Sequence, residues 1–317
     1  MRTRFLALAA AYRERSRYGR SSESDSMGSA ARSNPPWIRD AGALLALPIG
    51  LVVIHLVVPA AVRERWAFHF HEPSLFAVWM SAFLHRTVGH LLGNLVLYAL
   101  VVTTAYFLFR RWNRMDEFWI MLGGFLVIMP PIITMFEYAA LWYFLDVPAL
   151  AADSIGFSGI GHAYAGMLAA GLGWYTADRY TTEAGVGVTF LIYTLGIAVV
   201  LTIHRGLTTT ALLTIGIGLL LSAWWIASGI DWTGLEAAGR SLEDRVLDIG
   251  VLIGGITIVV IVVGAAFPTA VIAGGTATNV VAHAAGLLNG FVLAGVVLQL
   301  LDEEDLEAHP TGDALFD

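Results

Sequence analysis

A serine and a histidine lie in glycine-rich settings far apart in the chain. Ser158 belongs to the run Gly-Phe-Ser-Gly at 156–159, where a loop enters an apolar segment, and His283 belongs to a second apolar segment with several glycines. A serine hydroxyl is a weak nucleophile until a base takes its proton, and imidazole is the side chain that most often does so. If the fold brings these two side chains together, they can act as a nucleophile and its general base.

A second pair of polar side chains, His90 and Asn94, lies near one end of another apolar segment. Residues four apart on a helix point the same way, and both of these side chains can donate hydrogen bonds. Such donors stabilise the negative charge that develops on a carbonyl oxygen during acyl transfer. The four residues therefore predict a site for attack on a carbonyl group, provided that their helices converge.

Composition places the chain in a lipid bilayer. Of its 317 residues 57% are hydrophobic and 14% are charged, and the mean hydropathy is +0.71, more than a single soluble core needs. The net charge of −7 argues against nucleic acid as a partner. The lack of cysteine excludes disulfides, thiolate catalysis and cysteine-based metal sites. An acidic chain without lysine hints at a salt-rich cytoplasm, and we expect a multi-pass protein of a prokaryotic cell membrane.

Eight apolar runs are long enough to cross about 30 Å of hydrocarbon. They cover residues 41–62, 86–109, 118–144, 157–176, 186–203, 207–229, 247–267 and 277–301. Arginines before the first run and after the second are expected on the cytoplasmic side, where basic residues collect. We therefore expect an all-α polytopic membrane protein with both termini in the cytoplasm.

The segments outside these runs have their own patterns. Residues 1–40 are expected to form a basic, partly disordered cytoplasmic tail rather than a signal peptide, because their apolar stretch is short and is followed by arginines. Residues 302–317 are expected to form an acidic cytoplasmic tail. Aromatic residues within 63–85 predict a segment that lies in the membrane interface. The proline pair at 130–131 is expected to kink the third run, and Glu137 near its end to reach the headgroups.

The order of the runs predicts that Ser158 and His283 lie at one depth. Three crossings separate their helices, so both helices enter from the outer side and carry these residues near their starts. Small residues accompany each one: Gly159, Ala163, Gly166 and Ala170 beside Ser158, and Gly286, Gly290 and Ala294, with Asn279, beside His283. Small residues let membrane helices approach closely, as a hydroxyl–imidazole hydrogen bond requires.

Three separated motifs resemble those of the rhomboid intramembrane serine proteases. The run His-Arg-Thr-Val-Gly-His-Leu-Leu-Gly-Asn at 85–94 is similar to the family's helix with two histidines and an asparagine. The run at 156–159 is similar to its GxSG motif, and Ala-His-Ala-Ala-Gly-Leu-Leu-Asn-Gly at 282–290 to its AHxxGxxxG motif. The resemblance covers about residues 66–300. It implies that a transmembrane domain at 41–301 contains a rhomboid-like six-helix core with about two additional helices.

The resemblance also implies a role for each residue. Ser158 would be the nucleophile and His283 the general base of a Ser-His dyad, while His90, Asn94 and the backbone N–H of Ser158 would form the oxyanion hole. His85 would have a structural role in holding the loop that dips into the membrane. The implied activity is that of a serine endopeptidase that cuts a transmembrane segment of another protein within the bilayer, without cofactor or metal.

The chain departs from the family pattern in three places. The family has one helix between its serine and histidine helices where this chain has three, so residues 207–267 are expected to contain an inserted helical pair. His162 stands where the family has an aromatic residue four positions after the serine, and as an accessory residue it could hydrogen-bond to or stack on His283. The family's Trp-Arg pair in the interfacial loop is not in register, and Trp79 is a loose substitute.

Two other functions stay open at this stage. A rhomboid-like protein without activity would bind transmembrane helices of client proteins and leave them uncut, although such relatives usually lack the serine or the histidine, and both are present here. A multi-span transporter would need unwound central helices and repeat symmetry, which the sequence does not show. The histidines at 69, 71, 85 and 90 match no recognised zinc spacing.

Overall fold

The computed structural model describes residues 36–144, 153–229, 242–268, 272–273, 276–277 and 279–308. Its long helices are α2 (Pro36–Val57), α5 (Val88–Trp112), α6 (Met115–Glu137), α7 (Ser158–Arg179), α8 (Thr182–Arg205), α9 (Thr209–Gly229), α10 (Leu242–Ala266) and α11 (Val280–Ala308). The short elements are helices α3 (Ala60–Arg65), α4 (Leu75–Met80) and η1 (Ser81–Phe83), the π-helical segment η2 (Tyr138–Phe144), and the two-residue strands β1 (Phe68–His69), β2 (Asp153–Ser154), β3 (Ile272–Ala273) and β4 (Thr276–Ala277). Each predicted run overlaps one long helix, so the all-α polytopic class is confirmed.

The helix ends differ from the predicted boundaries. Helix α2 begins at Pro36, inside the predicted tail 1–40, and the rest of that tail lies outside the described residues. Helix α11 continues to Ala308, and Asp302 within it forms an ion pair with Arg114. Contacts divide the chain into the units Met1–Leu47 and Pro48–Asp317, and the packing described below is that of the second unit.

Seven of the described helices are long and apolar enough to span a membrane: α2, α5, α6, α8, α9, α10 and α11. Helix α7 was predicted as an eighth span but is not among them, although its 22 residues are long enough. It packs against α5, α6, α8, α10 and α11, and every residue from 159 to 173 is buried. Because α7 faces protein rather than lipid, it can consist largely of glycine, alanine and polar residues.

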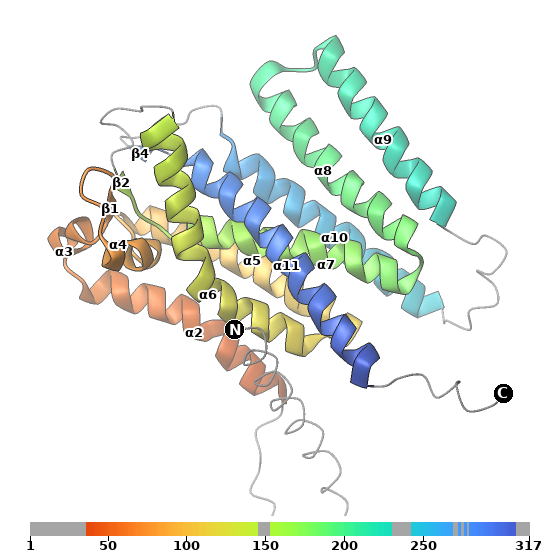
Figure 1. Cartoon of the computed structure of the whole chain (residues 1–317), viewed down its shortest axis with the longest axis horizontal. Coiled ribbons are helices and arrows are strands. Elements are labelled where there is room, and N and C mark those ends of the chain that lie inside the picture. The colour runs from red at the N-terminus through yellow and green to blue at the C-terminus, as the bar shows by residue number, and fades with distance from the viewer. Residues whose placement is uncertain are drawn as a thin grey trace, which may run out of the picture. The chain divides into compact units, whose positions relative to one another are not determined.

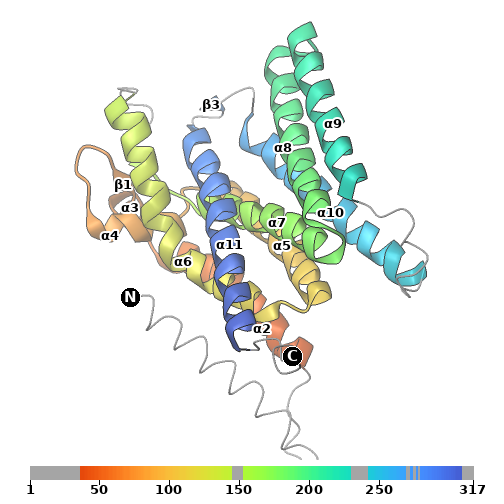
Figure 2. The ribbon, with the colours of Figure 1, turned by 45° about the vertical axis from the view of Figure 1, so that its right-hand side comes forward.

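Helices α7 and α11 touch backbone to backbone, as Figures 1 and 2 let the reader follow. A Cβ atom added to Gly286 would lie 2.1 Å from the carbonyl oxygen of Gly159, and one added to Gly290 would lie 2.1 Å from that of Ala163. On the other helix, a Cβ atom at Gly166 would lie 2.2 Å from the carbonyl oxygen of Leu287. The predicted stripes of small residues therefore do face each other.

The three helices between α7 and α11 do not pack in sequence order. Helices α8 and α9 lie side by side (Figures 1 and 2), and α9 makes most of its contacts with α8. Helix α10 packs instead against α5, α7 and α8. The predicted pair at 207–267 corresponds to α9 and α10, which both pack on α8, while α10 alone of the two packs closely on α5 and α7.

One buried carboxylate fixes α10 to two other helices. Asp248 has no exposed surface; it accepts hydrogen bonds from Arg111 Nε of α5 at 2.9 Å and from the hydroxyl of Tyr175 of α7, and Arg179 Nε lies 3.4 Å away. A charge that is buried without partners is costly, so these donors are needed for Asp248 to stay ionised.

The segment between α2 and α5 covers one end of the bundle. Its core is a cluster of Phe68, Phe70, Ala77 and Val78, against which Tyr138 and Leu141 pack. On α4 the large side chains of Leu75, Phe76 and Trp79 are exposed, and the location of this segment in the membrane interface stays a prediction.

Trp79 also donates a hydrogen bond to a carbonyl oxygen of α6 that a proline leaves without its helical donor. Proline has no N–H, so Pro131 cannot donate to the carbonyl of Val127 one turn earlier. The indole Nε1–H of Trp79 donates to that oxygen at 2.9 Å. The interfacial segment is thus joined to α6 at the place where the two prolines interrupt the helix ladder.

We predict that Gly290→Ala will destabilise the fold, because its new Cβ atom must push α11 away from α7. Overpacking of this kind costs about 1–3 kcal/mol, which thermal unfolding in detergent can detect. Gly295→Ala on the same helix is the matched control, since its Cβ atom would meet only Trp174 Nε1 at 4.0 Å. Equal unfolding temperatures for the two variants would contradict the close contact.

Candidate active site

A cavity of about 640 Å³ lies between α5, α6, α7, α10 and α11. Five of the six predicted site residues line it: Ser158, His283, His90, Asn94 and His162. The sixth, His85, is not part of its lining. Residues from three separate parts of the chain are thus brought to one place, as the order and spacing of the helices predicted.

Ser158 is the first residue of α7 and is partly exposed. The loop before it is fixed at several points. Ser154 pairs with Phe68 across the two short strands, and the backbone N–H of Gly156 donates to the carbonyl of Ser81 at 2.9 Å. These bonds attach the loop before Ser158 to the segment between α2 and α5. They therefore fix the position at which the Ser158 hydroxyl enters the cavity.

Gly156 is needed for the loop to pass close to α5. Its φ of +131° is one that side-chain-bearing residues rarely adopt. A Cβ atom here would also lie 2.5 Å from Cε1 and 2.6 Å from Nε2 of His90, and 3.7 Å from Nδ2 of Asn94. The absence of a side chain therefore lets the residues before Ser158 lie directly against His90 and Asn94.

His90 and Asn94 are presented by the first turns of α5. The helix is capped by Thr87, whose hydroxyl oxygen accepts a hydrogen bond from the backbone N–H of His90 at 3.1 Å. Asn94 is 4% exposed, and its Nδ2 has no hydrogen-bond partner among the residues that the structure describes. A buried donor left without an acceptor is costly, so Asn94 can serve a carbonyl oxygen that enters the cavity.

His283 lies in the first turn of α11 with 8% of its surface exposed. Its Nδ1–H donates to the carbonyl of Ala266, in the last turn of α10, at 3.1 Å. This bond places the proton of the neutral ring on Nδ1 and leaves the lone pair on Nε2, which is the form that a general base needs. No hydrogen bond joins Ser158 and His283 in the described part of the chain. Catalytic hydrogen bonds are often long before substrate binds.

His162 contacts both members of the pair. Its Nδ1–H donates to the carbonyl of Ser158 at 2.7 Å, and its ring stacks on that of His283 with 4.1 Å between centroids and 19° between planes. The sequence left open whether His162 would hydrogen-bond or stack. The structure has the stack on His283 and a hydrogen bond to the backbone of Ser158, so one side chain contacts both residues.

His85 packs against His90 but does not line the cavity. The ring has no exposed surface, neither nitrogen has a hydrogen-bond partner in the described structure, and its edge meets His90 with 5.1 Å between centroids. Burial, and then the nearby His90, His55 and Arg63, lower the pKa of His85 from its ordinary 6.5 to about 3. His85 therefore stays neutral and packs at the junction of the loop and α5.

The prediction for Glu137 was wrong. Instead of reaching the headgroups, its side chain is 1% exposed and lines the cavity. Glu137 Oε1 accepts hydrogen bonds from the hydroxyl of Ser154 at 3.0 Å and from Nδ2 of Asn279. The reason is that α6 continues into η2, so residue 137 is not at the end of the helical segment.

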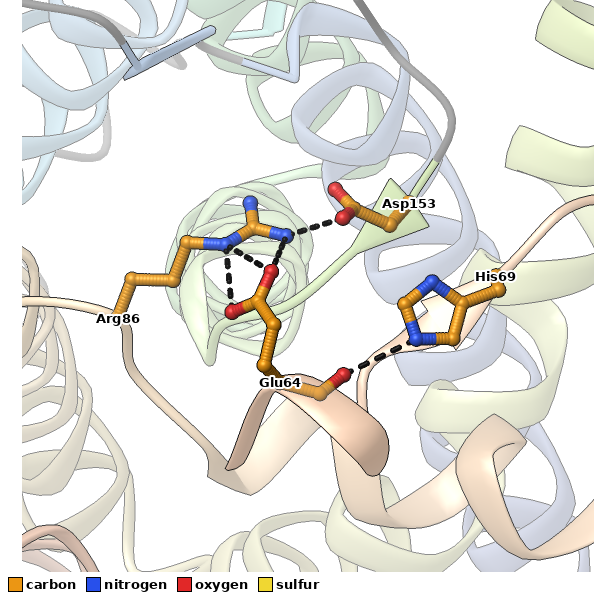
Figure 3. Close-up of polar contacts among 4 residues, drawn as sticks. All are labelled: Glu64, His69, Arg86 and Asp153. Atoms are coloured by element: carbon orange, nitrogen blue, oxygen red, sulfur yellow. Dashed lines mark hydrogen bonds and ion pairs between the residues drawn. The ribbon is translucent and has the colours of Figure 1, made fainter. Parts of the chain in front are cut away.

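Arg86 was not singled out from the sequence, although it also lines the cavity. Figure 3 shows its guanidinium group between two carboxylates. Nη2 donates to Glu64 at 3.0 Å and forms an ion pair with Asp153, while Nε lies 3.2 and 3.3 Å from the two oxygens of Glu64. His69 Nε2–H donates to the carbonyl of Glu64 at 3.0 Å. The group ties α3 and β1 to the loop that carries Ser158, with Arg86 itself just before α5.

We predict that acid will weaken the fold through His85. Between pH 6.5 and 3 the unfolded chain binds a proton at this residue and the folded chain does not, so its contribution is complete above pH 6.5 and falls as the pH is lowered. From pH 7 to pH 5 the loss is about 2 kcal/mol, at about 1.4 kcal/mol per pH unit below 6.5. Unfolding in detergent at both pH values measures it. His85→Phe should reduce the pH dependence; an unchanged dependence in this variant would contradict the assignment.

Comparison of the chain with protein-family models, with curated proteins and with solved structures finds no match in any of the three. The resemblance of the three motifs to the rhomboid proteases therefore stays a prediction. What can be said of this chain's activity comes from the residues around the cavity and from their geometry.

Proposed function

We propose that the chain is an intramembrane serine endopeptidase of the rhomboid type, with Ser158 as nucleophile and His283 as general base. The observation that carries this proposal is that both residues, with His90 and Asn94, line one cavity between α7 and four helices that are long and apolar enough to span a membrane. The tautomer of His283 set by Ala266 supports the role of base. The unpartnered Nδ2 of Asn94 supports the role of oxyanion donor.

The reaction would proceed by acyl transfer. Nε2 of His283 takes the proton of Ser158 as the hydroxyl oxygen attacks the peptide carbonyl, and His90, Asn94 and the N–H of Ser158 donate to the oxyanion that forms. The intermediate collapses when His283 returns the proton to the leaving amine. Water, activated by the same imidazole, then releases the acyl group and restores the serine.

Two contacts would stabilise the positive charge that His283 carries during these steps. The carbonyl of Ala266 accepts the Nδ1–H bond and belongs to the negative end of α10. On the other side, the ring of His162 stacks on His283, and a π face attracts a cation. The pair would thus operate without the third acidic residue found in many serine hydrolases.

The substrates would be transmembrane segments of other proteins. The residues that would act on the peptide bond lie near the first residues of α5, α7 and α11, close to where a membrane helix would leave the hydrocarbon. A peptide bond inside a helix is shielded by its own hydrogen bonds, so a substrate would have to unwind before the carbonyl could reach Ser158. We place the protein in a prokaryotic cell membrane with both termini in the cytoplasm.

We predict that Ser158→Ala will abolish cleavage of a model membrane substrate and the labelling of the protein by a fluorophosphonate, while its unfolding temperature is unchanged. His283→Ala should lower the rate by about 10²- to 10⁴-fold and Asn94→Ala by about 10²- to 10³-fold. Ser228→Ala, an exposed serine whose hydroxyl bonds back to its own helix, is the control. Cleavage by Ser158→Ala at the parent rate would overturn the assignment.

A second function is favoured by one observation, the missing hydrogen bond between Ser158 and His283. A protein of this fold that only binds client helices would keep the cavity without a working dyad. When immobilised on a column in detergent, such a protein would retain a model substrate without cleaving it, and a fluorophosphonate would not label it. Labelling that is lost in His283→Ala would exclude this alternative.

We predict that the stack on His283 is needed for rate. His162→Phe keeps a ring against the base and should retain cleavage within about tenfold, whereas His162→Ala leaves the base free to tilt and should lower kcat by about 10- to 100-fold. KM should be nearly the same in both variants, since His162 is buried and is placed to hold the base, not the substrate. Equal kcat values in parent and His162→Ala would show that the stack has no such role.

A further inference from the structure

We propose that Glu137 is a positioning residue that holds the two halves of the dyad at one level, an inference that rests on the proposed function. Glu137 does not contact Ser158 or His283 through any described hydrogen bond. It bonds instead to the segment just before each of them. One carboxyl group on α6 thus links the two parts of the chain on which the proposed chemistry depends.

The first bond reaches the serine loop. The hydroxyl of Ser154 donates to Oε1 of Glu137 at 3.0 Å, and Ser154 lies four residues before Ser158. On its other side the same residue pairs with Phe68 of β1. The loop is therefore bonded on one side to α6 and on the other to the segment between α2 and α5. These two bonds fix its path to the first residue of α7.

The second bond reaches the histidine helix. Asn279 uses both ends of its amide: Nδ2 donates to Oε1 of Glu137, and Oδ1 accepts the backbone N–H of Ala282 at 3.1 Å. The second contact is a helix cap, which fixes the first turn of α11. His283 follows Ala282 directly. Through Asn279, Glu137 therefore helps to fix the position of the proposed base.

The environment suits this role better than that of a salt bridge. Glu137 is 1% exposed, and among the described residues its hydrogen-bond donors are the neutral Ser154 and Asn279. A buried carboxyl group in an apolar helix is costly to keep and is by default functional. Since its two donors come from the two separate segments, the cost is offset only when both segments are in place.

The experiment compares three variants in detergent at a temperature well below unfolding. Glu137→Ala removes both bonds, and Glu137→Gln keeps an oxygen that can accept both. Glu117→Gln is the matched control, because Glu117 is also a buried acid of α6 but lies at the other end of the helix, paired with Arg114. The measurements are kcat, KM, the rate of fluorophosphonate labelling of Ser158, and the unfolding temperature.

We expect Glu137→Ala to lower kcat and the labelling rate by about 10- to 100-fold, as a misplacement of about 1 Å can do, with KM nearly unchanged. Glu137→Gln should stay within about threefold of the parent, and Glu117→Gln should match it. A merely structural role would lower the unfolding temperature without changing labelling by the protein that remains folded. Parent-like kcat and labelling in Glu137→Ala would overturn the proposal.

A double-mutant cycle separates this inference from the proposed function. If Glu137 acts through Asn279, the double variant Glu137→Ala/Asn279→Ala should be no slower than the worse single variant, and their effects on unfolding temperature should be non-additive. If the rate losses of the two single variants instead multiply in the double variant, and their losses of unfolding temperature add, the link between Glu137 and Asn279 is overturned. If the parent is neither labelled nor active, the proposed function fails, and the unfolding cycle alone still decides whether the link exists.

Discussion

The structure depends on the direct contact between the backbones of α7 and α11. A carbon added at Gly166, Gly286 or Gly290 would lie 2.1–2.2 Å from a carbonyl oxygen of the other helix. In a membrane this contact is not driven by water, since lipid chains are as apolar as leucine, and close van der Waals packing takes its place. Because Ser158 and His283 begin these two helices, the contact that stabilises the fold is also the one that brings the two residues to one cavity.

Polar groups inside the bundle are managed in a consistent way. Asp248 joins α10 to α5 and α7, Glu137 joins α6 to two loops, and Trp79 supplies the N–H that Pro131 lacks. Each of these contacts connects elements far apart in the chain. In hydrocarbon an unsatisfied polar group costs several kcal/mol, so a small number of such bonds can specify which helices become neighbours. Asn94 Nδ2 and His162 Nε2 lack a hydrogen-bond partner among the described residues, and both residues line the cavity.

Much of this arrangement could be predicted from the sequence, because length and hydropathy locate helices and glycine spacing locates their contacts. The eight helices and the two stripes belong to this class, whereas the stack of His162 on His283 is one of two contacts that the sequence left open. Glu137 and Arg86 could not be placed, since their partners lie in short elements and connecting segments that carry no periodic pattern. The packing of α10 against α5 could not be predicted either. A helix that is apolar on every side does not show in its sequence which face meets which neighbour. The lower hydropathy of α7 signals its central location only once its neighbours are known.

The bond from His283 to Ala266 has a consequence for how such a site can be turned off. The acceptor is a backbone carbonyl in the last turn of α10, so among the described residues no side chain fixes which nitrogen of the ring carries the proton. If that helix end moves away, the imidazole proton is free to pass to Nε2, and the nitrogen that should receive a proton already carries one. A small shift of α10 would then silence the chemistry while every residue of the site stays where it is.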